Sequence, residues 1–455
     1  MDLLQNDKHT VMTWAKAGVE YCSKFFLLLY IFTMPFVSAF SFSDIISLPL
    51  IFAAVISILM GLQIIKTGKL PVGFLGLDIL IFFLLFFLVL SSYCINGWGN
   101  SKSLNHTIAY ISSISLFYIA IKFTLFQLSD KNELLLKVLQ VISYATIVSA
   151  FYVNAEFILA NFFELDLNDY IPRPSEEQMF YKPYVIGLFF RARGFASESG
   201  AYTQMVELFA PLTVYYMFFS SYCKWSVWFK ITTVILIVIS IIFAASSATF
   251  IIVPIAVLIS VLVYIKKIVI YLRKKSIIFF LKTAIVLSFI ILISNYFSIY
   301  ANIILSLTDK ADSSSFDDRK ERIDFFYSKF SNVNIVNKLI GTGPAGFDVL
   351  GFDNGKSIIS LYYNITFELG LIGFFLLLLF LLYFFFSVFS LNSKLGFFLL
   401  IAFLSGTMHY YVMNNYWVPW FWFIGAIAIY CRSHNLMDTN PNNASFTNFY
   451  NEPLQ

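Results

Sequence analysis

Long runs of apolar residues alternate with short polar stretches along most of the chain, and this pattern predicts membrane-spanning helices. A helix needs about 20 mostly apolar residues to cross the hydrocarbon core of a bilayer. Backbone amides in lipid find partners only within helices or closed barrels. We therefore expect an all-α integral membrane protein with about 12 transmembrane helices. The runs are 24–42, 46–65, 74–94, 106–127, 137–160, 201–220, 226–244, 248–270, 277–300, 358–385, 395–413 and 416–431.

Two long polar segments interrupt this pattern and divide the chain. The first polar segment covers 164–200 and the second covers 301–357, which we expect to be partly helical. Residues 302–357 carry 15 of the chain's 56 charged residues (30 Lys and Arg, 26 Asp and Glu). Five helices are expected in 1–163, four in 201–300 and three in 358–432, followed by a polar tail over 433–455.

The composition is typical of a membrane protein and gives no support to other classes of protein. Of the 455 residues, 59% are hydrophobic and 12% are charged, whereas a soluble domain carries about 25% charge. A formal net charge of +4 gives no indication of a nucleic-acid partner. The four cysteines form no C-x-x-C or zinc spacing. We expect no disulfide, no metal and no cofactor.

The distribution of Lys and Arg predicts which side each segment faces, because cytoplasmic loops are enriched in these residues. With a cytoplasmic N-terminus, 18 of the 30 lie on inner segments and 12 on outer ones. Eleven of the outer residues belong to the two polar segments, and Lys102 is the other. Both polar segments are thus predicted to be periplasmic, and both termini cytoplasmic.

The first polar segment ends with two arginines before a predicted helix start. Arg191 and Arg193 are two residues apart, so an extended backbone places both on one side. Gly194 permits a turn, after which Ser197 or Ser199 can cap the next helix. A helix N-terminus beside two guanidinium groups suits a phosphate or diphosphate. Contact with lipid headgroups is the alternative.

Three nearby residues are further candidates. Glu198 is the one acid of this cluster and is interpreted either as a general base or as a partner that orients Arg193. Tyr202, at the start of the following helix, is a candidate substrate contact. Glu207 lies within that helix, where a carboxylate is costly; a structural hydrogen bond and a catalytic role both stay open.

The second polar segment contains a predicted helix from Asp317 to about Phe330. Its two arginines, Arg319 and Arg322, share a stripe about 100° wide with apolar residues. They are therefore predicted to face the membrane domain, where they would bind substrate phosphate. An amphipathic interfacial helix is the alternative. The apolar members of the stripe are Ile323, Phe326 and Phe330.

Three further features complete the candidate set. The run from Gly341 to Phe347 predicts a tight turn, with Gly341 and Gly343 allowing close backbone approach. His409 is interpreted either as a catalytic residue or as a structural histidine that is hydrogen-bonded within the protein. Four polar residues near helix ends are expected to be structural: Asp78, His106, Lys122 and Glu156.

The order of these patches resembles the O-antigen polymerase and ligase superfamily. The resemblance rests on Arg193–Ser199, on the turn at Gly341–Phe347 and on Glu368–Gly373, which is similar to a Glu-x-Gly-x-x-Gly segment of that family. Ligases of the superfamily carry a catalytic His, followed by Asn, Ser or Gln, eleven residues before the first glycine of that segment. Ile359 and Ser360 stand there, and this departure favours a polymerase.

The resemblance implies a glycosyltransferase at the periplasmic face of a bacterial inner membrane. Its donor and acceptor would be undecaprenyl-diphosphate-linked oligosaccharides, held in contact with membrane lipid; a polysaccharide chain-length regulator is left open as a further partner. Arginines, with Arg193 and Arg322 as the catalytic candidates, would stabilise the leaving diphosphate, and which of the arginines meets it stays open. Glu198 or His409 would be the base. A ligase, a capsule or common-antigen polymerase, and a lipid-linked oligosaccharide flippase or secondary transporter stay open as alternatives.

Overall fold

The computed structural model describes residues 2–42, 46–96, 99–173, 185–186, 189–274, 314–350, 358–391 and 393–434. Side chains are described for these residues except 2–17, 185–186, 189, 266–274 and 314–319. The described elements are α1 (Asp2–Thr33), α2 (Leu48–Thr67), α3 (Leu77–Asn96), α4 (Ser101–Ile114), the π-helix η1 (Ser115–Ala120), α5 (Ile121–Gln127), α6 (Lys131–Phe162), the 3-10 helix η2 (Leu167–Tyr170), β1 (Val185–Ile186), β2 (Phe189–Phe190), α8 (Ser199–Phe219), α9 (Val227–Ala244), α10 (Ser247–Lys274), α13 (Ser314–Asn332), α14 (Ile335–Ile340), α15 (Gly346–Val349), α16 (Leu361–Glu368), α17 (Gly370–Phe389), α18 (Lys394–His409) and α19 (Trp420–Ser433).

The described chain is a helical bundle, with one short antiparallel pairing of β1 and β2. Seven of its helices are long and apolar enough to cross a membrane. The structure therefore agrees with a multi-span α-helical membrane protein, and twelve spans stay a prediction. The predicted span 277–300 lies outside the described residues. The seven are α2, α3, the continuous stretch α4–η1–α5, α6, α9, the Ser247–Ile265 part of α10, and α17.

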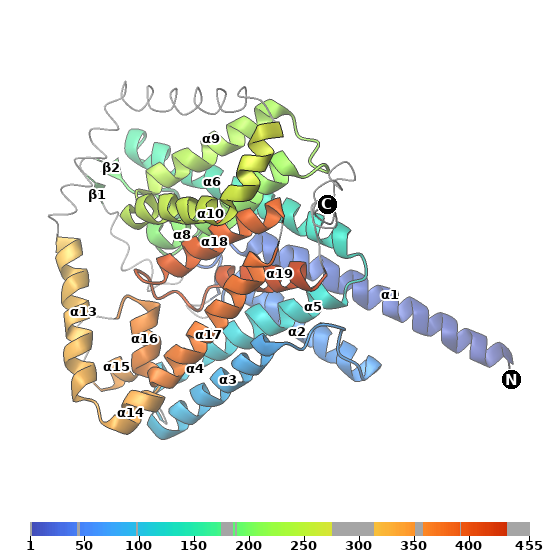
Figure 1. Cartoon of the computed structure of the whole chain (residues 1–455), viewed down its shortest axis with the longest axis horizontal. Coiled ribbons are helices and arrows are strands. Elements are labelled where there is room, and N and C mark those ends of the chain that lie inside the picture. Colours follow the sequence, from blue (N-terminus) through green and yellow to red (C-terminus); the bar gives the residue numbers. More distant parts are fainter. Residues whose placement is uncertain are drawn as a thin grey trace, which may run out of the picture.

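Both polar segments meet the bundle at the same end, which we call the loop end. Figure 1 shows α13 to α16, β1 and β2 at the left end of the view, whereas the N-terminal end of α1 projects at the right. Hydrogen bonds tie the first polar segment to the chain after α1, where Ser38 and Ala39 donate backbone N–H groups to the carbonyl of Phe195. The second is tied to α3, where the side-chain amide of Asn96 donates to the carbonyl of Gly341.

Helices α8 and α19 lie inside the bundle. This explains why α8 is more polar, and α19 shorter, than a lipid-exposed span. Helix α8 contacts α6, α9 and α18 and buries Gln204 and Glu207. Helix α19 has 14 residues, about 21 Å at 1.5 Å per residue, and it is buried along nearly its whole length. Such helices face other helices, so their side chains need not match lipid.

The predicted continuous span at 358–385 is wrong, because the chain breaks between α16 and α17. Gly370 begins α17 with a left-handed φ of +70°. In an uninterrupted helix the carbonyls of Phe367 and Glu368 would accept from amides four residues later. Here they accept instead from the backbone N–H groups of Thr342 (2.9 Å) and Gly343 (3.0 Å). A turn from the second polar segment thus replaces the helical bonds.

Other boundaries also follow from local chemistry. The predicted first span was too long at its C-terminal end, because α1 ends at Thr33 just before Met34-Pro35 and a proline disfavours helix in the residue before it. The predicted split near Ser246 is confirmed: Ala245 adopts a left-handed φ of 46° between α9 and α10.

Candidate functional site

A buried carboxylate organises the end of the first polar segment. Glu156, near the end of α6, accepts the backbone N–H groups of Gly194 (2.7 Å) and Arg193 (3.1 Å) on Oε2. Its Oε1 accepts from the side-chain amide of Asn168 at 3.0 Å. Gly194 makes the predicted turn, with φ +64°. Glu156 therefore fixes the backbone from which the two candidate arginines project.

The two arginines bind different parts of the protein. Arg193 is buried (3% exposed), and its guanidinium donates to the carbonyl of Ser197 at 3.0 Å and to the side-chain oxygen of Asn168 at 3.3 Å. Arg191 is half-buried and donates to the carbonyl of Ala244 at 3.1 Å and to the Ser199 hydroxyl. Arg193 thus braces the segment, while Arg191 reaches the start of α8.

A third buried arginine was missed by sequence reasoning. Arg173 donates to the Ser38 hydroxyl (3.0 Å) and to the carbonyls of Gly194 and Ala196. These contacts join the first polar segment to the chain after α1. Only its position within the polar segment could have drawn attention to it, because nothing local predicts a partner such as Ser38, 135 residues away.

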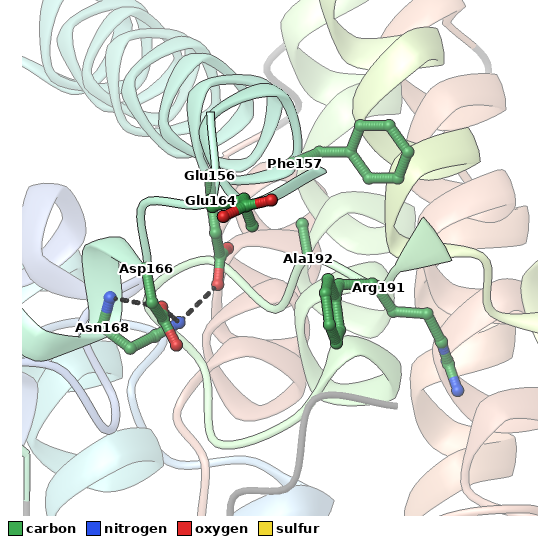
Figure 2. Close-up of a pocket in the computed structure, with 9 residues that line it drawn as sticks. Glu156, Phe157, Glu164, Asp166, Asn168, Arg191 and Ala192 are labelled. Carbon is green, nitrogen blue, oxygen red and sulfur yellow. Dashed lines mark hydrogen bonds between the residues drawn. The ribbon is translucent and has the colours of Figure 1, made fainter. Parts of the chain in front are cut away.

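A cavity of about 200 Å³ lies beside Glu156. Figure 2 shows Asn168 between Glu156 and Asp166, held by the hydrogen bonds drawn there, while Arg191 extends away from these acids. The lining combines carboxylates, an amide, a guanidinium group and aromatic rings, groups that bind polar hydroxylated ligands. Its residues are Glu156, Phe157, Ala160, Glu164, Asp166, Asn168, Phe190, Arg191 and Ala192.

Of the remaining candidates near the first polar segment, Glu198 lies at the surface and Tyr202 in the core. Glu198 is exposed and occupies the N-cap position of α8 without a side-chain capping bond. The prediction that Ser197 or Ser199 caps this helix is therefore wrong, and the Ser199 hydroxyl accepts from Arg191 instead. Tyr202 is buried, and its hydroxyl donates to that of Ser240 at 2.6 Å. It faces the core rather than the cavity.

The second polar segment carries the predicted amphipathic helix as α13, which begins three residues before Asp317. Phe326 is buried and packs on Phe367 of α16, and Phe330 lies beside both. Arg322 and Ile323 are half-buried, whereas Lys320, Glu321 and Asp324 are exposed. These exposures confirm the predicted inward face for its described members; the side chain of Arg319 lies outside the description.

The glycine turn is docked on the break between α16 and α17. Gly341 has φ +91°, and a Cβ there would lie 2.0 Å from the carbonyl oxygen of Glu368. Gly343 has φ +95° and packs against Asn96 of α3. The backbone N–H of Ala345 donates to Glu368 Oε1 at 2.9 Å. Two patches of the family resemblance, the turn and the Glu368–Gly373 segment, thus form one structural unit.

Glu368 also joins this unit to α4. Its Oε1 lies 2.9 Å from Nδ1 of His106, and its Oε2 accepts from the Tyr110 hydroxyl at 2.7 Å. One turn before His106, Lys102 forms a 2.9 Å ion pair with Asp348 of α15. His106 was expected to be structural, and its partner across the fold gave no local signal in the sequence.

His409 lies in the interior of the bundle rather than at an accessible site. Its Nδ1 is 2.8 Å from Oε2 of Glu207, and its Nε2 is 3.1 Å from the Met413 sulfur. The side chains of His409 and Glu207 are 1% and 0% exposed. The pair joins α18 to α8, in line with the structural reading of both residues.

Many of the polar residues that the sequence singled out therefore lie in two clusters at the loop end, around Glu156 and around Glu368, whereas the pairs Glu207–His409 and Asp78–Lys122 are buried within the bundle. No model of a known protein family matches this chain, and no curated protein matches it.

Proposed function

We propose that this protein is a membrane glycosyltransferase that polymerises undecaprenyl-diphosphate-linked O-antigen repeat units at the periplasmic face of a bacterial inner membrane. The observation that carries the proposal is the docking of the Gly341–Gly346 turn on Glu368. Two of the three segments that resemble the polymerase superfamily dock on each other there, at the same end of the bundle as β2, which directly precedes Arg191 (Figure 1).

The proposed reaction moves a growing chain from its lipid carrier to a new repeat unit. A hydroxyl oxygen of the acceptor sugar bonds to the anomeric carbon of the donor chain, and the bond from that carbon to the diphosphate oxygen breaks. The lipid diphosphate leaves with the electron pair, and the hydroxyl proton passes to a base. Guanidinium groups suit the leaving diphosphate because their donors match its oxygens.

The geometry favours different roles for the candidate arginines. Arg191 and Arg322 are half-buried on the loop-end surface, so their guanidinium groups can approach a substrate at the membrane face. Arg193 is buried among protein acceptors, so we assign it a positioning role. The cavity beside Glu156 is proposed to hold a sugar of the substrate, because carboxylates and amides accept and donate to hydroxyl groups.

A transporter of lipid-linked oligosaccharide is the second candidate, and a specific observation favours it. Two pairs of ionisable side chains are buried in the bundle: Glu207 with His409, and Lys122 with Asp78 at 2.6 Å. Ionisable groups in membrane-spanning segments often mark transport pathways. The polymerase is preferred because the polar clusters at the loop end are larger and lie beside the two long segments.

The lipopolysaccharide ladder of a strain lacking this gene tests the proposal. Loss of the ladder with a single repeat unit still attached to the core supports a polymerase. Loss of every capped species, with polymer retained on its lipid carrier, would indicate a ligase. Loss of capped species without any polymer would indicate the transporter, and an unchanged ladder would reject the O-antigen assignment. Restoration by the wild-type gene is the control.

A further inference from the structure

A histidine–carboxylate pair at the loop end has the arrangement of an oriented general base. Within the described residues, every other hydrogen bond to the Glu368 carboxylate comes from a donor, namely the Tyr110 hydroxyl and the Ala345 N–H. An ionised carboxylate accepts only, so Nδ1 of His106 donates to it. The proton of the neutral imidazole is then on Nδ1, and Nε2 is left as a proton acceptor.

Accessibility separates the two histidine–carboxylate pairs found among the described side chains. The side chain of His106 is 25% exposed, whereas that of Glu368 is 1% exposed. Across the described part of the chain, Nε2 of His106 has no hydrogen-bond partner. In contrast, Nε2 of His409 is buried against Met413. Only His106 can therefore present its acceptor nitrogen to a molecule that binds at the loop end.

The surroundings of His106 also suit a polar substrate. Lys102 and Asp348 form a partly exposed ion pair one helical turn away, and the glycine turn passes over Glu368 on the other side. His106 is the sixth residue of α4, about 8 Å along the helix from its first residue. This depth places the imidazole near the membrane surface, where a sugar hydroxyl can reach it.

We propose that His106 is the general base of the transfer reaction and that Glu368 is its positioning residue; this inference rests on the proposed function. Nε2 takes the proton of the acceptor hydroxyl as the hydroxyl oxygen bonds to the anomeric carbon and the lipid diphosphate leaves. The imidazolium stays paired with the Glu368 carboxylate and then releases its proton to solvent. Glu368 keeps the ring in the productive tautomer, as acids do beside histidine bases.

The test compares variants of the two side chains that bond to the Glu368 carboxylate, His106 and Tyr110. His106→Asn keeps an N–H donor near the position of Nδ1 but has no nitrogen that accepts a proton. Tyr110→Phe removes the other side-chain donor to Glu368 and is the matched control. In the deletion strain, we expect His106→Asn to reduce polymer by about 10²–10⁴-fold at a wild-type protein level in the membrane. Tyr110→Phe should lose about tenfold, the lower end of the effect of a hydrogen bond to a charged group, because it keeps the proton acceptor on His106.

Chemical rescue provides a readout that a structural role would not change. Imidazole added to cells carrying His106→Ala should restore part of the ladder, because a free base can replace the missing ring. Equal losses in His106→Asn and Tyr110→Phe, or a wild-type ladder in His106→Asn, would overturn the assignment. Absence of both His106→Asn and His106→Gln from the membrane would also overturn it, in favour of a structural role. A deletion strain with an unchanged ladder would reject the polymerase itself, before any variant is compared.

Discussion

The backbone N–H of Gly194 donates to the Glu156 carboxylate at 2.7 Å, and this bond folds the first polar segment onto the end of α6. The neighbouring N–H of Arg193 donates to the same oxygen. The carboxylate thus sets the backbone direction at the turn from which Arg191 and Arg193 emerge. A residue without a direct chemical role can in this way decide where the arginines lie.

Replacing Glu156 by Gln is expected to destabilise the protein. A glutamine side chain has one acceptor oxygen, and its NH₂ group would face donors already present around Glu156. Leaving a buried donor unpaired costs about 1–3 kcal/mol, seen as a lower apparent unfolding temperature of the purified protein in detergent. Glu164→Gln is the control, because this exposed acid lines the same cavity. If Glu164→Gln lowers the unfolding temperature as much as Glu156→Gln, the hydrogen bonds of Glu156 do not have the stabilising role assigned to them.

Gly341→Ala is expected to disrupt the docking of the second polar segment. The new Cβ would lie 2.0 Å from the carbonyl oxygen of Glu368, and φ is +91°. A positive φ of this kind costs a non-glycine residue about 1–3 kcal/mol of conformational strain, and the steric clash adds to this cost. The apparent unfolding temperature of the purified protein and the amount of polymer should both decrease. Gly61→Ala in α2 meets no atom within 4 Å and should be neutral; equal loss in both variants would show that the close contact is unimportant.

Arg322→Ala is expected to abolish polymer without lowering the amount of protein in the membrane. Arg322 lies half-buried on the inward face of α13, whereas Lys320 on the same helix is exposed. Lys320→Ala should therefore change the lipopolysaccharide ladder little. If Lys320→Ala reduces polymer as much as Arg322→Ala, then lying on the inward face of α13 is not what makes a basic residue functional.

The Glu207–His409 pair is expected to show strong coupling in a double-mutant cycle. His409→Leu leaves a buried carboxylate without its partner, which costs about 3–5 kcal/mol. Replacing both residues by Leu removes both ionisable groups, so the double variant should be more stable than His409→Leu. Apparent unfolding temperatures of His409→Leu, Glu207→Leu and the double variant measure this coupling. Additive losses would show that the two side chains do not stabilise each other.

The sequence by itself determined the features that depend on local pattern. Runs of apolar residues predicted membrane helices, and seven described helices have the required length and composition. The 100° stripe predicted the inward face of α13, since burial along one helix follows its own periodicity. Gly194 was also correctly expected at a turn, because a residue's backbone preference is set by its own side chain.

Only the tertiary structure decided which polar residues meet. The His106–Glu368 bond spans 262 positions in the sequence, so neither residue carries a local sign of its partner. The break before Gly370 arises because a distant turn supplies the donors for the last carbonyls of α16, and apolar periodicity contains no such information. The same limit applies to His409, whose burial against Glu207 depends on how α8 and α18 pack. Hydropathy is a property of each segment, whereas a site is a property of contacts between segments.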